Sequence, residues 1–286
     1  MFRRFFSNFI WAGLVGGPCA GIGFAAELSR SDRERLAVDA HAAFNAGQYA
    51  EARMKWTQAL AGGATRAEAR RWRPELGRTY EAEENYQKAL AAYQEAFDID
   101  PKNVDRLVDL ARLYDAVEID DQAIRFYADA HARDRGRRDV SFALARLYKQ
   151  GGRLAEARAL AEDAVHAEPR DYSGQELLAD IEEAQGQLSQ AAQRRETVLS
   201  MHPTAQGYME LGRLWAKQDA FEQADVAFTR ALAAGGKGVD PLFERAVLAW
   251  RQGKTGTAVQ FLDQIAVRSA DDFPAGFLRV LMALEA

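Results

Sequence analysis

The pentapeptide LARLY at residues 110–114 occurs again at residues 144–148, and this repetition decides the fold. The two copies start 34 positions apart. LGRTY at 76–80 precedes the first copy by the same 34 positions, and LGRLW at 211–215 follows the second by 67, close to twice that interval. All four segments read leucine, small residue, arginine, any residue, aromatic. A fixed interval of this length is typical of a repeat architecture.

A second pattern starts about nine residues after each segment: an alanine, an aromatic or small residue four positions on, and an alanine three further. It occurs as Ala89/Tyr93/Ala96, Ala123/Tyr127/Ala130, Ala157/Ala161/Ala164 and Ala224/Phe228/Ala231, and earlier as Ala52/Trp56/Ala59. These spacings place the three residues on one face of a helix. Between the two patterns lie glycines suited to a left-handed helix end, namely Gly47, Gly152, Gly186 and Gly253. Each unit is therefore predicted to be a hairpin of two helices, with Pro101, Pro169 and Pro203 between units.

A single hairpin cannot bury its own apolar stripe, but stacked hairpins join their stripes into one core. The pattern resembles the tetratricopeptide repeat family, whose 34-residue unit has Leu, Gly/Ala and Tyr on its first helix and Ala, Phe/Tyr and Ala on its second. The resemblance implies an all-α, right-handed α-solenoid. Residues 27–272 are expected to hold about seven repeats, and residues 273–286 a helix that caps the open end. The units should begin near Arg33, Arg70, Val104, Arg138, Tyr172, Ala205 and Val239.

Some positions depart from this pattern. Pro74 lies inside the first helix of the second unit, so we expect that helix to begin at Pro74, after a separate short helical piece at 65–72. Ser31 and Glu34 have the spacing of a capping box that opens the first helix. In the fifth unit Glu182 and Arg195 replace residues expected to be aromatic or small, which indicates a softer joint or a surface covered by something else.

The first 26 residues have the layout of a secretory signal peptide. Arg3 and Arg4 precede an uncharged apolar run, and small residues at Gly23 and Ala25 suit cleavage after Ala25. The alternative is a retained N-terminal membrane anchor, because about 20 apolar residues can span a bilayer. Five glycines and Pro18 in this run favour cleavage. Either interpretation predicts an exported protein of the periplasm or cell envelope of a Gram-negative-type bacterium.

Composition argues against several classes of function. The formal charge of −5 disfavours general nucleic-acid binding. The four histidines lie in separate units without paired-ligand spacing, and no carboxylate pair stands in an apolar setting. The glycine-rich string at 21–26 and Gly253-Lys254-Thr255 lack the context that nucleotide-binding motifs need. We therefore expect no enzyme activity, no cofactor and no metal.

The repeated arginine is the candidate for function. On a helix it lies about 150° from the apolar stripe, so it should face outward, which in the resembling family is the concave groove that binds partners. The candidate site residues are Arg78, Arg112, Arg146, Lys149 and Arg213, with Asp180 interrupting the strip. These cations suit carboxylate or phosphate ligands. The alternative is a solvated face whose arginines are neutralised internally by nearby Asp105, Asp109, Asp115 and Asp139.

These observations predict a non-catalytic scaffold for protein–protein interaction. The expected partner is an extended protein or peptide segment, acidic or C-terminal, held in the groove. A second hypothesis, from a different class, is an accessory protein that contacts anionic polysaccharide during envelope or exopolysaccharide assembly and export. Partner sequence should govern peptide binding, whereas charge density and salt should govern polysaccharide binding.

Overall fold

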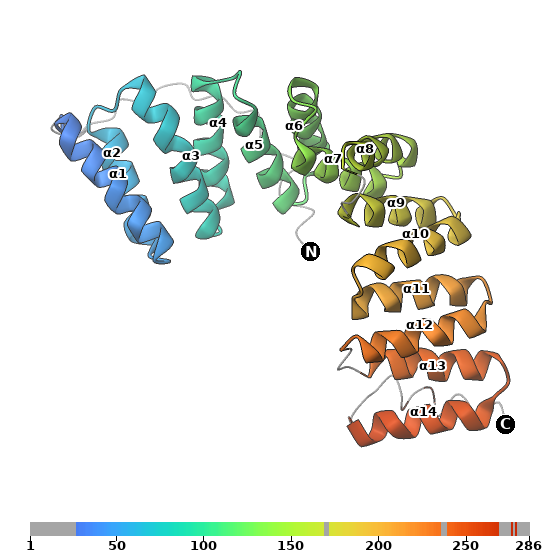
Figure 1. The fold of residues 1–286 in the computed structure, drawn as a ribbon. Coiled ribbons are helices and arrows are strands. Elements are labelled where there is room, and N and C mark those ends of the chain that lie inside the picture. Colours follow the sequence, from blue (N-terminus) through green and yellow to red (C-terminus); the bar gives the residue numbers. More distant parts are fainter. Residues whose placement is uncertain (1–26, 169–171, 236–238, 269–275, 277, 279–286) are drawn as a thin grey trace. The chain divides into compact units, whose positions relative to one another are not determined.

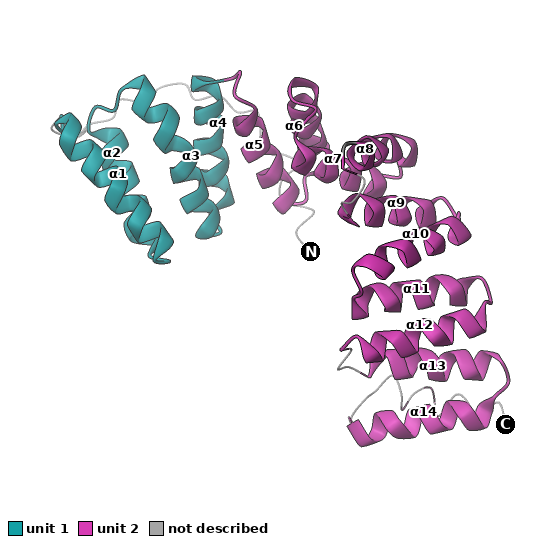
Figure 2. Ribbon diagram, viewed as in Figure 1, with its two compact units in different colours: residues 1–100 teal, residues 101–286 magenta. Residues whose placement is uncertain are grey.

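The computed structural model describes residues 27–168, 172–235, 239–268, 276 and 278. Within these ranges the chain folds into fourteen helices that follow one another as seven hairpins (Figure 1). It divides between Asp100 and Pro101 into two compact units (Figure 2). The first contains α1 (Arg30–Asn45), α2 (Tyr49–Ala61), α3 (Arg66–Ala82) and α4 (Tyr86–Ile99). The second contains α5 (Val104–Ala116), α6 (Asp120–Arg133), α7 (Arg138–Gln150), α8 (Leu154–Ala167), α9 (Tyr172–Ala184), α10 (Leu188–Met201), α11 (Ala205–Lys217), α12 (Phe221–Ala233), α13 (Asp240–Arg251) and α14 (Thr255–Arg268).

Within each unit, every helix packs against the next one in the chain, so the hairpins form a stack. This is the α-solenoid architecture that the 34-residue interval predicts. The predicted unit starts at Val104, Arg138, Tyr172 and Ala205 coincide with the first residues of α5, α7, α9 and α11. The prediction of an all-α hairpin array is therefore confirmed for the described residues.

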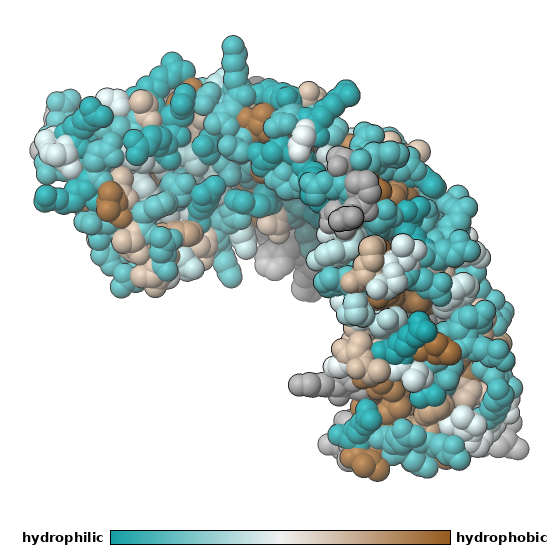
Figure 3. Space-filling model, viewed as in Figure 1, coloured by the Kyte–Doolittle hydropathy of each residue, from teal (hydrophilic) through white to brown (hydrophobic). Residues whose placement is uncertain are grey.

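The repeated apolar residues form the core. In the first unit, Trp56, Trp72 and Leu76 bury their side chains between α2 and α3. In the second unit, both LARLY segments bury their leucines and their alanine. The face shown in Figure 3 is largely hydrophilic with smaller apolar areas, and the exposed large apolar side chains are scattered over several helices.

In the hairpins α3/α4 and α11/α12, the small residue of the first helix is a glycine, which lets a side chain of the second helix come close to the backbone of the first. A Cβ on Gly77 would lie 2.5 Å from Tyr93 Cε1, and a Cβ on Gly212 would lie 2.4 Å from Phe228 Cε1. Both rings are fully buried. Glycine at these positions therefore lets an aromatic ring of the second helix pack directly on the backbone of the first.

The turns inside the hairpins use left-handed residues, as predicted for the four glycines. Gly47, Gly152, Gly186 and Gly253 have φ between +72° and +77°. The other three hairpins have a non-glycine residue in the same conformation: Glu84 at φ 57°, Glu118 at 59° and Asp219 at 56°. The left-handed turn is thus common to all seven hairpins, although only four of them show it in the sequence.

The N-terminal cap of the first helix lies at a different residue from the predicted Ser31. That residue lies inside α1, and the N-cap is Ser29, whose hydroxyl accepts a hydrogen bond from the Asp32 backbone N–H. The predicted Ser31 capping box is therefore wrong. A capping box does open α3, where Thr65 and Glu68 satisfy each other's backbone N–H groups. Glu68 also accepts two hydrogen bonds of 3.2 Å from the buried Arg33 guanidinium.

The prediction for Pro74 is also wrong, because α3 runs continuously from Arg66 to Ala82 with Pro74 inside it. A proline in a helix interior forfeits one backbone hydrogen bond and crowds the preceding turn. Here the capping box fixes the first turn, and buried Trp72 and Leu76 anchor the helix on both sides of the proline. Tertiary packing thus outweighs the local cost, and the separate piece expected at 65–72 is the first part of α3.

Two expectations concern residues outside the described ranges. The signal peptide or anchor at 1–26 lies wholly outside them, and only residues 276 and 278 of the expected capping helix at 273–286 are described. Within the described ranges, no helix combines the length and the apolar character needed to cross a membrane.

Candidate functional site

The predicted strip residues lie on the first helices of their hairpins. Arg78 is on α3 in the first unit; Arg112 on α5, Arg146 and Lys149 on α7, and Arg213 on α11 are in the second. The four arginine side chains are 42–50% exposed, which agrees with the outward direction expected from the helix geometry. Lys149 is more enclosed, at 25%.

Each of these cations is close to a carboxylate. Arg78 Nη1 lies 3.1 Å from Glu75 Oε1, and Arg112 Nη2 lies 3.8 Å from Asp109 Oδ1, both on their own helices. The other three pair with the first helix of a neighbouring hairpin: Arg146 with Asp115, Lys149 with Asp180 at 2.7 Å and Arg213 with Glu244 at 2.6 Å. Internal pairing, the alternative considered from the sequence, therefore accounts for much of the strip's charge.

Of the four aspartates expected to neutralise the strip, two do so. Asp109 and Asp115 pair with Arg112 and Arg146, as just described. Asp105 and Asp139 instead both pair with Arg137, at 2.7 Å each, in the turn before α7. Arg137, and not the strip, thus receives the charge of these two aspartates.

The fifth hairpin buries charged side chains where the repeat pattern has aromatic or small residues. Glu182 on α9 is 1% exposed and accepts two hydrogen bonds from Arg194, of 2.7 and 3.0 Å. Arg195 on α10 is 7% exposed and lies between Asp180 and Glu210, to which it donates from Nη2 and Nη1. Contacts within the chain bury both departures from the repeat pattern, so neither needs a cover supplied by another molecule.

Two depressions lie side by side along the first helices of the second unit. The α7/α9 depression has a volume of about 370 Å³ and is lined by Phe142, Ala143, Arg146, Lys149, Ser173, Glu176, Leu177 and Asp180. The α9/α11 depression has a volume of about 600 Å³ and is lined by Lys149, Asp180, Glu183, Ala184, Arg195, Glu210, Arg213 and Lys217. They share Lys149 and Asp180, and three of the five predicted site residues line them.

Glu176 is a site residue that the sequence reasoning missed. The residue is half-buried, and its side chain makes no hydrogen bond or ion pair with the rest of the described chain. Burial raises the pKa of its carboxyl, while nearby Arg195 opposes this rise and the carboxylates of Glu210 and Asp180 add to it. The 34-residue interval from Phe142 places Glu176 on the groove face, and this interval was the signal that could have identified it.

The aromatic side chains Phe142, Phe243 and Trp250 lie on the first helices of their hairpins and divide into two groups. Phe142 lines the α7/α9 depression. Phe243 and Trp250 instead pack against the apolar cluster formed by α13 and α14. Only Phe142 is therefore placed to contact a ligand in either depression.

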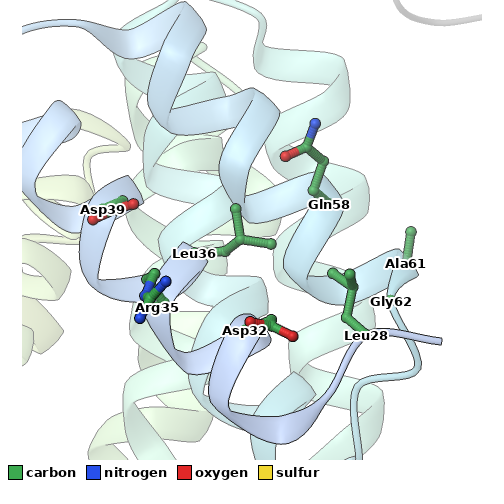
Figure 4. A pocket seen from close by; sticks show the side chains of 8 residues that line it. All are labelled: Leu28, Asp32, Arg35, Leu36, Asp39, Gln58, Ala61 and Gly62. Carbon is green, nitrogen blue, oxygen red and sulfur yellow. The ribbon is translucent and has the colours of Figure 1, made fainter. Parts of the chain in front are cut away.

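The first unit has a depression of its own, of about 540 Å³, between α1 and α2 (Figure 4). Figure 4 shows Leu28 before α1, Leu36 on α1 and Gln58 on α2 around it. Asp32, Arg35 and Asp39 also contribute to its wall. None of the predicted strip residues lines this depression.

The described residues contain no group of three His, Cys, Asp or Glu side chains that could hold a metal ion. The groove side chains can exchange ion pairs and cover apolar groups, which is the chemistry of binding.

Comparisons with known proteins agree with this geometry. Residues 121–181 and 75–103 match two models of the tetratricopeptide repeat. A tetratricopeptide repeat protein from Parabacteroides merdae superposes with a TM-score of 0.68 at 14% identity, covering 88% of this chain and 99% of that one. PilW, a type IV pilus biogenesis factor, superposes with a TM-score of 0.61 at 19% identity, covering 74% of this chain and 98% of that one. YrrB, a tetratricopeptide repeat protein with an unusual peptide-binding site, superposes with a TM-score of 0.52 at 16% identity, covering 66% of this chain and 97% of that one. A comparison with curated protein sequences finds no match.

Stacked hairpins of this length, with two charged depressions along the first helices of the second unit, define a helical-repeat protein. The matched segments and the Leu-small-aromatic pattern show that the chain contains tetratricopeptide repeats, and the similar solved structures share its fold.

Proposed function

We propose that this protein is a non-catalytic interaction scaffold that binds an extended segment of a protein partner along α7, α9 and α11. The repeats themselves support the general role of a protein-interaction scaffold. The observation that carries the finer proposal is the pair of adjoining depressions on these three helices. An extended chain can occupy such a surface at several weak points at once.

The strip residues Arg146, Lys149 and Arg213 are proposed to contact the partner by exchanging ion pairs. Their present partners, Asp115, Asp180 and Glu244, are themselves 19–36% exposed, so water and a ligand can compete for them. Exposed ion pairs contribute only about 0–1 kcal/mol, which makes such exchange inexpensive. Arg78 and Arg112 extend the proposed contact surface within their own units.

A cell-envelope setting is proposed on two grounds. The N-terminal 26 residues have the composition of an export signal. One of the proteins with a similar fold is a type IV pilus biogenesis factor. The partner is therefore sought among exported and envelope proteins.

Site-specific photo-crosslinking in the organism that encodes the protein tests this proposal. A photoreactive amino acid at Ala143, in the wall of the α7/α9 depression, is expected to crosslink to a defined protein. The same group at Gln193, exposed on α10, is the matched control and should not give this product. Equal crosslinking from both positions would contradict groove binding.

The same experiment separates peptide binding from polysaccharide binding. A protein partner yields a product that protease digests and whose sequence can be read. A product sensitive to glycosidases, with binding that falls steeply as salt is added, would favour anionic polysaccharide instead.

A further inference from the structure

One charged side chain of the α7/α9 depression lacks a partner within the described chain. Four ionisable side chains line it: Arg146, Lys149, Glu176 and Asp180. Arg146 is paired with Asp115, and Lys149 with Asp180. Of these four, only Glu176 has neither a hydrogen bond nor an ion pair within the described chain.

The neighbouring carboxylate is fully engaged. Asp180 accepts from Lys149 Nζ through Oδ2 at 2.7 Å and from Arg195 Nη2 through Oδ1 at 2.6 Å. An anion entering the depression would have to displace Asp115 or Asp180 from its cation. A cation would instead find the half-buried carboxylate of Glu176, and a charge-assisted hydrogen bond to it would replace no existing contact.

The apolar part of the wall limits the kind of cation. Phe142 and Leu177 line the same depression and are only partly buried. A lysine or arginine side chain has an aliphatic stem that covers apolar surface and a charged head that reaches a polar partner. A purely apolar side chain would cover Phe142 and Leu177 but would leave the Glu176 carboxylate desolvated and unpaired, which is unfavourable.

We propose that the α7/α9 depression is a subsite for one lysine or arginine side chain of the bound segment, with Glu176 as its counter-ion and Phe142 and Leu177 against its stem. This inference rests on the proposed function and specifies what the groove selects. The arginine strip predicts a partner with acidic side chains, whereas this subsite prefers a basic side chain of that partner.

Selection from a library of random heptapeptides displayed on phage, against the immobilised full chain, tests the inference. Lysine or arginine should be enriched at one fixed position of the selected peptides. In synthetic versions of these peptides, norleucine at that position, or Glu176→Gln in the protein, should each weaken binding about tenfold in fluorescence anisotropy, as expected for one charge-assisted hydrogen bond. Combining the two changes should add little further loss.

Two variants complete the test. Glu196→Gln is the matched control, because Glu196 is an exposed glutamate of α10 outside the depression; it should leave affinity unchanged. Glu176→Lys should shift the selection toward aspartate or glutamate. Because Glu176 has no partner within the described chain, both of its variants should retain the native circular dichroism spectrum.

The outcomes separate the two proposals. Groove-binding peptides without a basic residue, or basic peptides that bind Glu176→Gln and Glu196→Gln equally, would overturn the subsite and leave the scaffold proposal standing. If Ala143 gives no specific crosslink, the groove proposal fails, and the subsite fails with it; if the crosslink forms but no selected peptide competes with it, only the subsite is overturned.

Discussion

Replacing Gly212 by alanine tests whether close helix packing holds the hairpins together. The added Cβ would lie 2.4 Å from Cε1, 2.6 Å from Cδ1 and 2.8 Å from Cζ of Phe228. Carbon atoms in van der Waals contact are about 3.5–4.0 Å apart, so the ring must retreat by about 1 Å. Phe228 is completely buried, so this displacement must be absorbed by the core between α11 and α12.

Two opposing effects set the magnitude. Alanine is better than glycine in a helix interior by about 1 kcal/mol. Overpacking a filled core costs about 1–3 kcal/mol. We expect Gly212→Ala to lower the free energy of unfolding by up to about 2 kcal/mol. Gly256→Ala, at a helical position in α14 with no atom within 4 Å of the new Cβ, should be neutral or stabilising by up to about 1 kcal/mol.

Urea denaturation followed by far-UV circular dichroism measures both variants, and amide hydrogen exchange localises the effect. Repeat arrays can lose two-state behaviour, so exchange of the α11 and α12 amides is the decisive measurement. Phe228→Leu in the Gly212→Ala background should recover part of the loss, because the smaller side chain makes room for the methyl group. If Gly212→Ala is as stable as Gly256→Ala, the packing argument is wrong.

Three further predictions follow from the ion pairs. Burial alone would raise the pKa of Glu68, but hydrogen bonds from Thr65 and Arg33 lower it. The native chain should therefore be more stable than Glu68→Gln above about pH 4.5, and this advantage should disappear as the pH falls through the lowered pKa. Denaturation at several pH values measures this difference. Glu182→Gln should destabilise the chain by about 1–3 kcal/mol in urea denaturation, because it weakens the buried bidentate pair with Arg194. Glu182→Leu combined with Arg194→Met should recover much of that loss, because no buried charge is then left without its partner. An equal loss in both variants would contradict a buried ion pair at this position. Arg112→Ala with Arg146→Ala should leave helicity and thermal melting nearly unchanged, because both arginine side chains are more than 40% exposed and the buried Asp109 keeps its hydrogen bond from Arg106. The double change should weaken capture of the crosslinked partner; unfolding without loss of binding would show that these arginines are structural.

The repeat architecture could be predicted because it depends on intervals in the sequence. Leu110, Leu144 and their equivalents recur at the spacing of one hairpin, and each is buried where the pattern places it. The outward direction of Arg112 and Arg146 follows from helix geometry alone. These features are local, so one sequence is sufficient to derive them.

Features that depend on neighbouring hairpins were not predictable in the same way. The helix containing Pro74 is continuous because residues packed around it compensate for the lost hydrogen bond. Glu84 adopts a left-handed turn because both flanking helices require it, although its residue type does not suggest this. The pairing of Lys149 with Asp180, and the absence of a partner for Glu176 among the described residues, depend on which side chains meet across two hairpins.

The ion pairs between successive first helices give the stack a fixed order. Lys149 meets Asp180, which belongs to the next hairpin, and Arg213 occupies the corresponding position one hairpin later. Deleting the hairpin formed by α9 and α10 would preserve the backbone pattern but bring Lys149 opposite Arg213, so two positive charges would repel each other at the new junction. Modules with almost identical scaffolds are thus not interchangeable, and evolution by loss or duplication of a module in this part of the chain requires compensating changes of charge.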